Sequence, residues 1–344
     1  MTIQIGILGA GNISDTHARA ALAIPGVEIA AVYGRNVEKA RRLAELYGGV
    51  PYDRLEQFLD HRPMDLVAIG SPSALHGEQG IAAAERGLHV LVEKPLDINT
   101  ARADALIAAT DRAGVKLGVF FQDRLKPDVV KLKGMLDAGV IGRPILASGR
   151  VKWYRPPEYY GGSRWRGTFK LDGGGALINQ AIHTLDLMLH LWGPIVSVDA
   201  RAGTQLHTIE VEDTVVATLQ FENGALGVFE ASTAVFPGYA RRVELTGANG
   251  TLTLEHDSLV GVDLKVADPR FSPESLAPAQ GAAVNASSPT VSDATPHRRI
   301  IEDFLHAIGT SGRPACDGPE GRRSVVVIDA IYVSARSNEP VTIK

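Results

Sequence analysis

The N-terminal third of the chain constrains the fold most, because short β-branched runs alternate there with longer amphipathic runs. The strand-like runs cover residues 3–8, 27–33, 65–70, 88–93 and 115–121. Between them, apolar residues recur at spacings of three and four and several segments end in glycine, which is the pattern of helices. Strands that alternate with helices form a parallel sheet covered by those helices. We therefore predict a doubly wound α/β domain over residues 1–122.

The remainder of the chain follows a different pattern. Apolar and polar residues alternate with a period of two over residues 144–154, 214–232 and 240–256. Asn-Gly pairs within this part of the chain mark tight hairpins. Helical patterns cover residues 128–139, 175–193, 297–310 and 320–337. This combination predicts an α+β domain over residues 123–344 with a large, open, mainly antiparallel sheet. One face of that sheet is available for self-association, so we expect a homodimer or homotetramer.

Length and composition limit the class of protein. A chain of 344 residues exceeds the usual size of a single core, which agrees with two domains. Residues 268–296 are rich in Pro, Ala and Ser and predict a long surface loop. The net charge of -4 offers no basic field for nucleic acid or anionic lipid, and no apolar run approaches the roughly 18 residues of a spanning helix. We expect neither a nucleic-acid partner nor a membrane partner.

The cellular compartment is indicated by one residue and by the start of the chain. Cys316 is the only cysteine, so no intramolecular disulfide can form and a reducing compartment is favoured. The first strand-like run begins without a charged and apolar leader ahead of it. We expect a cytoplasmic protein.

A glycine-rich turn follows the first expected strand. The stretch ILGAGNIS puts Gly9, Gly11 and Ser14 in the positions of a G-x-G-x-x-G turn at the start of a helix. Two glycines allow a tight turn and a close approach to a pyrophosphate, whose charge the N–H groups at Asn12 and Ile13 would meet. The alternative is a purely structural turn. Because a complete βαβ unit follows, the sequence predicts a dinucleotide site in a Rossmann domain.

The choice of dinucleotide depends on the end of the second strand. NAD-binding domains usually carry an acidic residue there, and NADP-binding domains a basic one. This chain has Tyr33, Gly34, Arg35 and Asn36, without a carboxylate. Arg35 could pair with a 2'-phosphate or stack on adenine, although a solvated arginine is the alternative. The sequence favours NADP(H) over NAD(H).

Polar residues follow the other expected strands at the edge where ligands of doubly wound sheets bind. Lys94 is the most informative, because Pro95 restricts its backbone to extended conformations. A solvated strand-end lysine is the alternative. The cofactor contacts expected at this edge are Ser71, Pro72, His76, Glu93, Lys94 and Gln122.

The stretch LDGGGALINQAIH combines three glycines with a helical pattern. Glycines at 173–175 predict a close approach of the backbone to the nicotinamide. A spacing of four places Asn179 and His183 on one helix face, continued by Asp186 and His190, which predicts a lined cleft. His183 could instead be a core histidine. A zinc site of His183, Asp186 and His190 is a further alternative, but hydride transfer to a nicotinamide needs no metal and we expect none.

Aromatic and guanidinium side chains precede the glycines. Such faces and edges suit a sugar ring, whereas the alternative is a hinge packed by large side chains. The substrate contacts expected here and on the following helix are Trp153, Tyr154, Tyr160, Asn179 and Gln180. Trp165 and Arg166 are expected to contact the cofactor, and Arg166 could also reach an anionic substituent.

Four features together resemble the Gfo/Idh/MocA oxidoreductases, which act mostly on sugars, inositols and related polyols. They are ILGAGNIS, VEKP, GGGALINQAIHTLD and the antiparallel second half, so the likeness covers nearly the whole chain. The resemblance implies that Lys94 and His183 flank the nicotinamide and the reacting carbinol. It also implies interconversion of a secondary alcohol and a ketone on a sugar, nucleotide sugar or cyclitol. Much of the family has an aspartate four residues before the histidine, where this chain has Asn179.

The pKa of an ordinary imidazole makes His183 the expected general base, with Lys94 hydrogen-bonded to the same oxygen. Asn179 cannot titrate and can only orient the hydroxyl or the imidazole. Two other functions stay open. One is a glycoside hydrolase that oxidises C3 transiently with bound NAD, as some members of that family do, and the other is a dinucleotide-binding regulator without turnover.

Overall fold

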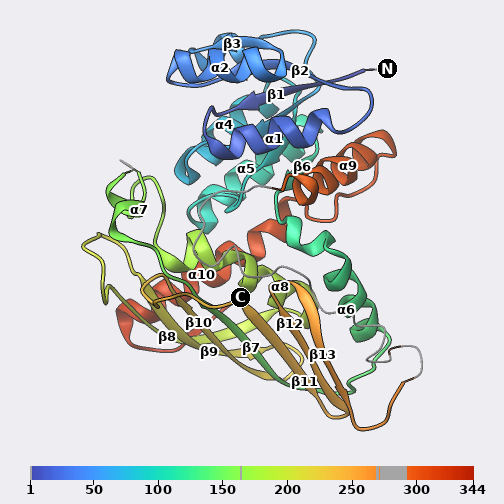
Figure 1. The fold of residues 1–344 in the computed structure, drawn as a ribbon, viewed down its shortest axis with the longest axis vertical. Helices are drawn as coiled ribbons and strands as arrows, with labels where there is room; N and C mark the ends of the chain where they lie inside the picture. The colour runs from blue at the N-terminus through green and yellow to red at the C-terminus, as the bar shows by residue number, and fades with distance from the viewer. Residues whose placement is uncertain (1, 163–164, 269–270, 272–292) are drawn as a thin grey trace. The chain divides into compact units, whose positions relative to one another are not determined.

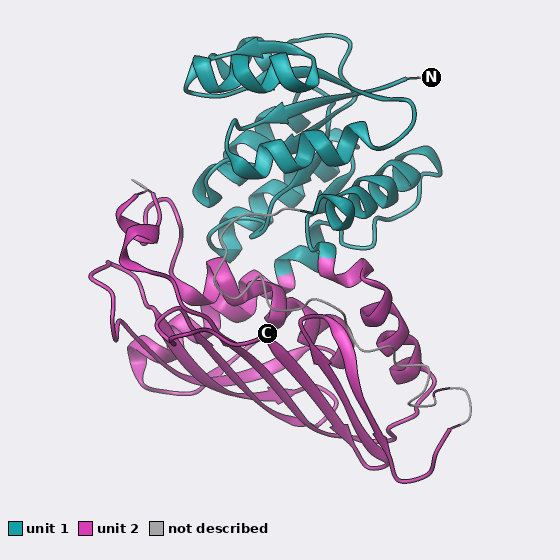
Figure 2. Ribbon diagram, viewed as in Figure 1, with its two compact units in different colours: residues 1–122, 290–322 teal, residues 123–289, 323–344 magenta. Residues whose placement is uncertain are grey.

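The computed structural model describes residues 2–162, 165–268, 271 and 293–344, and these form two compact units (Figure 2). Unit 1 contains residues 1–122 and 290–322, and unit 2 contains residues 123–289 and 323–344. The sequence analysis placed everything after residue 122 in the second domain, whereas residues 290–322 belong to unit 1. The surface loop expected over 268–296 lies mostly outside the described residues.

Unit 1 is built on a six-stranded parallel sheet in the order β3-β2-β1-β4-β5-β6 (Figure 1). Its strands are β1 Ile3–Leu8, β2 Val27–Tyr33, β3 Val50–Tyr52, β4 Leu66–Ile69, β5 His89–Val92 and β6 Leu117–Val119. This confirms the predicted doubly wound α/β domain. The sequence pattern missed β3, because a three-residue edge strand containing Pro51 carries too little alternation.

Helices connect these strands. They are α1 Asn12–Leu22, α2 Val37–Tyr47, α3 Leu55–Leu59, the short η1 Ser73–Leu75, α4 His76–Ala84 and α5 Thr100–Ala113. Side chains cap two of them: Asn36 accepts from the Lys39 N–H and Asn99 from the Arg102 N–H, each at 3.0 Å. Such caps stabilise a helix start by about 1 kcal/mol each.

The C-terminal part of unit 1 completes its core. Helix α9, Thr295–Gly309, packs on α1 and buries Ile300, Ile301 and Phe304. The Val119 N–H of β6 donates to the Cys316 carbonyl at 2.9 Å. A segment that supplies apolar side chains to this core belongs to it, which is why residues 290–322 join unit 1. Helix α10, Gly318–Ser337, begins in unit 1 and continues in unit 2.

Unit 2 contains an eight-stranded sheet in the order β13-β12-β11-β7-β10-β9-β8-β14. All neighbouring strands are antiparallel except β7 and β10, so the predicted mainly antiparallel sheet is confirmed. The strands are β7 Pro144–Lys152, β8 Ile195–Gly203, β9 Thr214–Phe221, β10 Leu226–Ser232, β11 Arg242–Gly247, β12 Gly250–Glu255, β13 Ser258–Leu264 and β14 Val341–Thr342. The two Asn-Gly pairs lie in the β9–β10 and β11–β12 hairpins, as expected.

The helical segments of unit 2 are η2 Gln122–Leu125, which begins at the last residue of the first segment of unit 1, α6 Pro127–Asp137, α7 Pro157–Gly161, the π-helical η3 Ala176–Ala181 and α8 Ile182–Trp192. Segment η3 packs on β7, β9 and β10, and α8 packs on β7 and β11. Along β9 burial alternates: Val215, Ala217 and Leu219 are buried, whereas Val216 and Thr218 are exposed. One face of the sheet is therefore covered and the other is open. Among the described residues, no helix has the length and apolar character needed to cross a bilayer.

Candidate active site

The glycine-rich turn of unit 1 requires glycine at Gly9. The φ of Gly9 is +126°, and a Cβ there would lie 2.6 Å from Ser14 Oγ and 2.8 Å from the Gly70 carbonyl oxygen. Ser14 is fully buried beneath the turn, in the position where the motif needs a small residue. The departure from glycine at this position is therefore accommodated by packing.

The space in front of α1 is open. Gly11 is exposed, and a Cβ placed on it would meet no other heavy atom within 4 Å. The first-turn N–H groups at Asn12 and Ile13 have no acceptor within the helix, and the helix dipole is positive at this end. A bare backbone before an eleven-residue helix fits a pyrophosphate group.

The end of β2 adjoins this turn, because the Gly9 N–H donates to the Tyr33 carbonyl at 2.9 Å. Arg35 follows and is exposed, whereas the Asn36 side chain is engaged as the cap of α2. No carboxylate stands in the chain between Tyr33 and Asn36.

His76 ties two loops of unit 1 together. Its side chain is buried, with Nδ1 2.8 Å from the Pro95 carbonyl oxygen and Nε2 3.0 Å from the Ser71 carbonyl oxygen. Burial lowers the pKa of His76, against the raising effect of these two contacts. Both ring nitrogens thus face backbone, while Ser71 and Pro72 are half-buried on the loop itself.

Glu93 lies in a buried cluster with His17 and His297. Its Oε1 is 3.0 Å from His17 Nε2 and 3.4 Å from His297 Nε2, and its Oε2 accepts from the Lys94 backbone N–H at 3.2 Å. Burial alone would raise the pKa of Glu93, but the two imidazoles hold it well below its usual range. We call these three residues the buried trio. Sequence reasoning missed His17 and His297, because nothing in the chain signals that residues so far apart meet.

Lys94 is half-buried at the end of β5, and its peptide bond to Pro95 is cis. Its backbone N–H is fixed by Glu93 and the next carbonyl by His76. Unit 1 therefore holds the backbone on both sides of the lysine.

In unit 2, close contacts with other residues require glycine at Gly174 and Gly175, which the sequence analysis did not predict. A Cβ on Gly175 would overlap the Glu212 carbonyl oxygen, and one on Gly174 would overlap the Tyr332 hydroxyl. The buried Glu212 carboxylate accepts from the Gly175 N–H at 3.0 Å, the Leu177 N–H at 3.0 Å and the Tyr332 hydroxyl at 3.0 Å. The expected contact with a nicotinamide is not needed to explain these two glycines, because close approach to Glu212 and Tyr332 requires them.

The helix after the glycines begins as a π-helix, so the predicted stripe at four-residue spacing does not continue through it. Asn179 donates from Nδ2 to Asp172 Oδ1 at 2.7 Å, which fixes its amide. Asp186 was expected in a lined cleft, but this expectation is wrong: Asp186 is buried and forms a bidentate pair with Arg124 at 2.7 and 2.8 Å. That pair also occupies the carboxylate that the zinc alternative needed.

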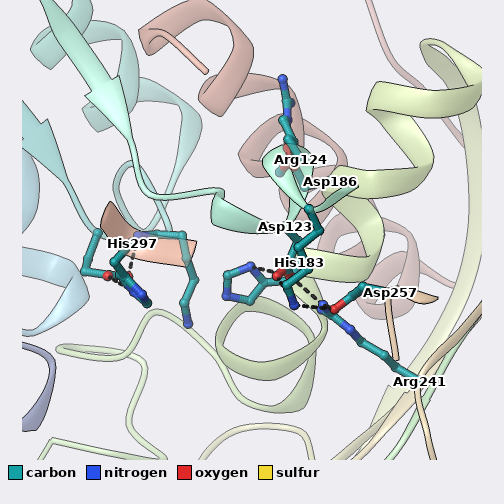
Figure 3. A network of polar contacts seen from close by, with 11 residues as sticks. Asp123, Arg124, His183, Asp186, Arg241, Asp257 and His297 are labelled. Atoms are coloured by element: carbon teal, nitrogen blue, oxygen red, sulfur yellow. Dashed lines mark hydrogen bonds and ion pairs between the residues drawn. The ribbon is translucent and has the colours of Figure 1, made fainter. Parts of the chain in front are cut away.

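His183 is half-buried, with 13% of its side chain exposed, and its Nδ1 lies 3.4 Å from Asp123 Oδ2 (Figure 3). Asp123 is buried and binds Arg241 at 2.6 Å and Lys126 at 2.8 Å. Asp257 also contacts both cations. Burial alone would raise the pKa of Asp123, but Arg241, Lys126 and His183 hold it well below its usual range. Asp123 stands in the strand-end sequence QDR and was not among the predicted site residues.

The aromatic segment of unit 2 forms a stack of rings and guanidinium groups. The Arg155 Cζ lies 5.0 Å from the Trp153 ring centroid, and the Arg166 Cζ lies 4.6 Å from that of Tyr159. Gln180 donates to the Tyr159 hydroxyl at 2.7 Å.

Other members of this segment differ in exposure. Tyr160 is buried against Thr233, with which its hydroxyl bonds at 2.8 Å, and burial raises its pKa to about 12. Tyr154 is half-buried and packs edge-on against Phe236, and Trp165 is half-buried beside Arg166. Tyr160 is therefore a packing residue, whereas Trp153, Tyr154 and Gln180 keep part of their surface exposed.

Two family models match the chain. The model described as the oxidoreductase family with an NAD-binding Rossmann fold matches residues 3–121, and the model described as the GFO/IDH/MocA C-terminal domain matches residues 129–253.

Individual proteins are similar over most or all of the chain. A myo-inositol 2-dehydrogenase of Thermotoga maritima is 29% identical over 73% of this chain and 74% of its own length. A scyllo-inositol 2-dehydrogenase (NAD(+)) of Bacillus subtilis is 29% identical over 76% of this chain and 78% of its own. The crystal structure of the WlbA dehydrogenase from Bordetella pertussis, in complex with NADH and UDP-GlcNAcA, is 29% identical with a TM-score of 0.91, covering 100% of this chain and 98% of that one.

Proposed function

Because the chain belongs to the Gfo/Idh/MocA family of oxidoreductases, we propose that it moves a hydride between a nicotinamide dinucleotide and a secondary alcohol of a sugar, nucleotide sugar or cyclitol. The observation that carries the proposal is the open, positively polarised start of α1 behind Gly9 and Gly11. The names of relatives, which include two inositol dehydrogenases and a dehydrogenase with bound UDP-GlcNAcA, support the substrate class.

The cofactor, when bound, supplies the carbon that accepts or donates hydride. Gly9, Gly11 and the N–H groups at Asn12 and Ile13 would hold its pyrophosphate. Further contacts are proposed from Ser71, Pro72, Lys94, Gln122, Trp165 and Arg166. His76 and Glu93 are proposed to act one step away, because each is buried and holds the backbone next to Lys94.

The proton chemistry is assigned to His183. In the oxidation, His183 would accept the proton of the substrate hydroxyl, and the bound cofactor would accept the hydride from the carbinol carbon. Lys94 donates a hydrogen bond to the same oxygen and favours its developing negative charge. Asn179 orients the hydroxyl through its amide, which Asp172 fixes. In the reduction, the imidazolium returns the proton.

The proposed substrate wall consists of Trp153, Tyr154 and Gln180, since aromatic faces and an amide suit a ring with several hydroxyls. Arg155 and Arg166 stack on the neighbouring rings and add cationic edges. We propose that copies of the chain associate through the open sheet face, where Leu146, Val216, Leu226 and Val228 are exposed, as a homodimer or homotetramer. The cytoplasm is the proposed compartment, because a chain whose one cysteine is Cys316 cannot form an intramolecular disulfide.

We propose NADP(H) as the favoured cofactor over NAD(H), with Arg35 as the group that contacts the 2'-phosphate. The exposed Arg35 at the end of β2 supports this choice, while the WlbA structure contains NADH. Arg35→Ala is expected to weaken NADPH binding much more than NADH binding in a fluorescence titration. Equal losses would remove the 2'-phosphate role.

The function itself is tested with a panel of inositols, aldoses and uronates and both cofactors. A net change in absorbance at 340 nm is expected with at least one substrate. Cleavage of a glycoside without net reduction of the cofactor would instead support the hydrolase. Binding of NADPH without any turnover, unchanged by His183→Ala, would support the regulator.

A further inference from the structure

We propose that Asp123 is a positioning residue that holds the His183 imidazole in the tautomer whose lone pair is on Nε2, and that it strengthens the imidazole as a base. The catalytic part of this inference rests on the proposed function. The contact between the two side chains does not, because both belong to unit 2 and their geometry is defined without a ligand.

The tautomer follows from what a carboxylate can do. An ionised carboxylate only accepts hydrogen bonds, so the nitrogen that faces it is favoured with its proton on. The nitrogen facing Asp123 is His183 Nδ1, at 3.4 Å. A neutral imidazole carries one proton, so a proton on Nδ1 leaves a lone pair on Nε2. The distance is longer than a good hydrogen bond, and such contacts between catalytic groups commonly tighten when a substrate binds.

Asp123 stays ionised and stays in place. Arg241 and Lys126 bind its carboxylate at 2.6 and 2.8 Å, and these cations keep its pKa low although the group is buried. The adjacent Arg124 is locked by its bidentate pair with Asp186 on α8, the same helix that carries His183. Both partners of the contact are thus anchored to one helix.

The charged side chains around His183 in unit 2 cancel as a set of four, of which Asp123 makes the direct contact. Asp123 faces the ring directly, while Arg241, Lys126 and Asp257 stand behind it. Two carboxylates and two cations sum to zero, so the sign of the local effect is set by the nearest group. That group is a carboxylate, which favours the protonated imidazole and makes the neutral ring a better proton acceptor. Asn179 carries no charge, so it cannot supply this effect.

The chain offers a matched control. Asp123→Asn and Asp257→Asn each remove one carboxylate from the same pair of cations, but the contact with His183 at 3.4 Å is made by Asp123. Both variants are expected to lose similar thermal stability. Asp123→Asn alone is expected to move the His183 titration to lower pH and to reduce kcat/KM by roughly 10- to 100-fold, less than the loss of the base itself.

The first measurement needs no substrate. In protein labelled with ¹⁵N-histidine, the His183 signals are identified by their loss in His183→Gln, and their shifts report the tautomer and the titration midpoint. The wild-type protein is expected to carry the proton on Nδ1. A proton on Nε2, a midpoint unchanged in Asp123→Asn, or an equal shift in Asp257→Asn would overturn the inference. The tautomer of His183 is measured on the wild-type protein, so this test of the inference stands even if Asp123→Asn does not fold.

The second measurement is the pH profile of kcat/KM for the best substrate of the panel. Its acid limb is expected to move to lower pH in Asp123→Asn and to stay in place in Asp257→Asn. The two proposals fail separately. If the His183 titration depends on Asp123 but no sugar is turned over, the coupling stands and the proposed function fails. If a sugar is turned over but the acid limb does not move in Asp123→Asn, the function stands and the positioning role of Asp123 fails.

Discussion

Each unit places a histidine against a buried carboxylate, but the two arrangements differ in access and in charge. In unit 1 the His17 side chain is 0% exposed and meets Glu93 at 3.0 Å, with His297 as the second neighbour. In unit 2 the His183 side chain is 13% exposed and Asp123 is balanced by two cations. The side chains of the buried trio are inaccessible to a ligand, whereas part of the His183 side chain is exposed and can contact one.

The two carboxylates also differ in the groups that compensate their charge. Glu93 contacts two imidazoles and a backbone N–H of unit 1, and these neighbours surround its carboxylate only when unit 1 is folded. The charge of Asp123 is already met by Arg241 and Lys126, so a proton can enter or leave His183 without uncovering an uncompensated carboxylate. A pairing of an imidazole with a carboxylate therefore serves stability in one unit and, in our proposal, proton transfer in the other.

The largest expected effect separates the two histidines in activity. His183→Gln removes the proposed base, and kcat/KM should fall by about 10²- to 10⁴-fold while the melting temperature changes little. His17→Gln should do the reverse, because it disturbs a buried contact and leaves the base in place. Steady-state rates and thermal melts of both variants test this. If His17→Gln costs as much activity as His183→Gln at a temperature where both are folded, the division of roles is wrong.

The next effect concerns stability. Glu93→Gln keeps the shape of the side chain but removes the charge that His17 and His297 meet, so the free energy of unfolding should fall by about 1–3 kcal/mol. Urea unfolding followed by far-UV circular dichroism measures it. Glu28→Gln, a change at an exposed carboxylate in the same sheet, serves as the control. An equal change in the two variants would mean that the buried trio contributes no special stability.

The fold was largely predictable because local periodicity reports it directly. Five of the six strands of unit 1 and both Asn-Gly hairpins of unit 2 follow from runs of a few residues. The strands that were missed include β3, β13 and β14, which lie at or next to a sheet edge, and β8, a nine-residue strand inside the second sheet whose pattern was not recognised. The membership of residues 290–322 in unit 1 was not predictable, since it depends on apolar contacts between distant segments.

The candidate site was predictable only where a motif is continuous. Gly9 and Ser14 occupy the positions that the turn requires, and the motif encodes this locally. The close approach of Gly175 to Glu212 was not predicted, because Glu212 is far away in the chain. His17 and Asp123 were missed for the same reason: a partner reached through the fold leaves no spacing signal. Asp123 did carry one usable sign, its place at the end of a predicted strand.

A smaller effect appears in the pH dependence of stability. Burial lowers the pKa of His17 below 6.5, so the unfolded chain binds more protons than the native one between the native pKa and 6.5. Glu93, with a lowered pKa, loses its contribution only at still lower pH, as the pH falls through its native value. The melting temperature should therefore fall as the pH drops below 6.5. In His17→Gln the dependence of the free energy of unfolding on pH in that window should become shallower, by up to about 1.4 kcal/mol per pH unit for this one proton. A slope unchanged in the variant would show that His17 is not the titrating group.

The smallest expected effect is that of divalent metals on the buried trio. The donor atoms of His17, Glu93 and His297 lie within 4.8 Å of one another. Among the described residues, this group has the donor types and the closeness of a zinc site. Two ligands of a tetrahedral zinc stand about 3.4 Å apart, given zinc–ligand distances of about 2.0–2.2 Å. The distance of 3.4 Å between His297 Nε2 and Glu93 Oε1 fits two ligands of one zinc ion as well as a direct contact. The distance of 3.0 Å between His17 Nε2 and Glu93 Oε1 is that of a hydrogen bond, with a proton rather than a metal between the atoms. We expect the melting temperature to be the same after EDTA treatment and after addition of stoichiometric zinc. A rise in melting temperature on adding zinc that disappears in Glu93→Gln would show that the buried trio binds a metal. The difference between the buried trio and His183 would then be that one binds a metal and the other, in our proposal, a substrate.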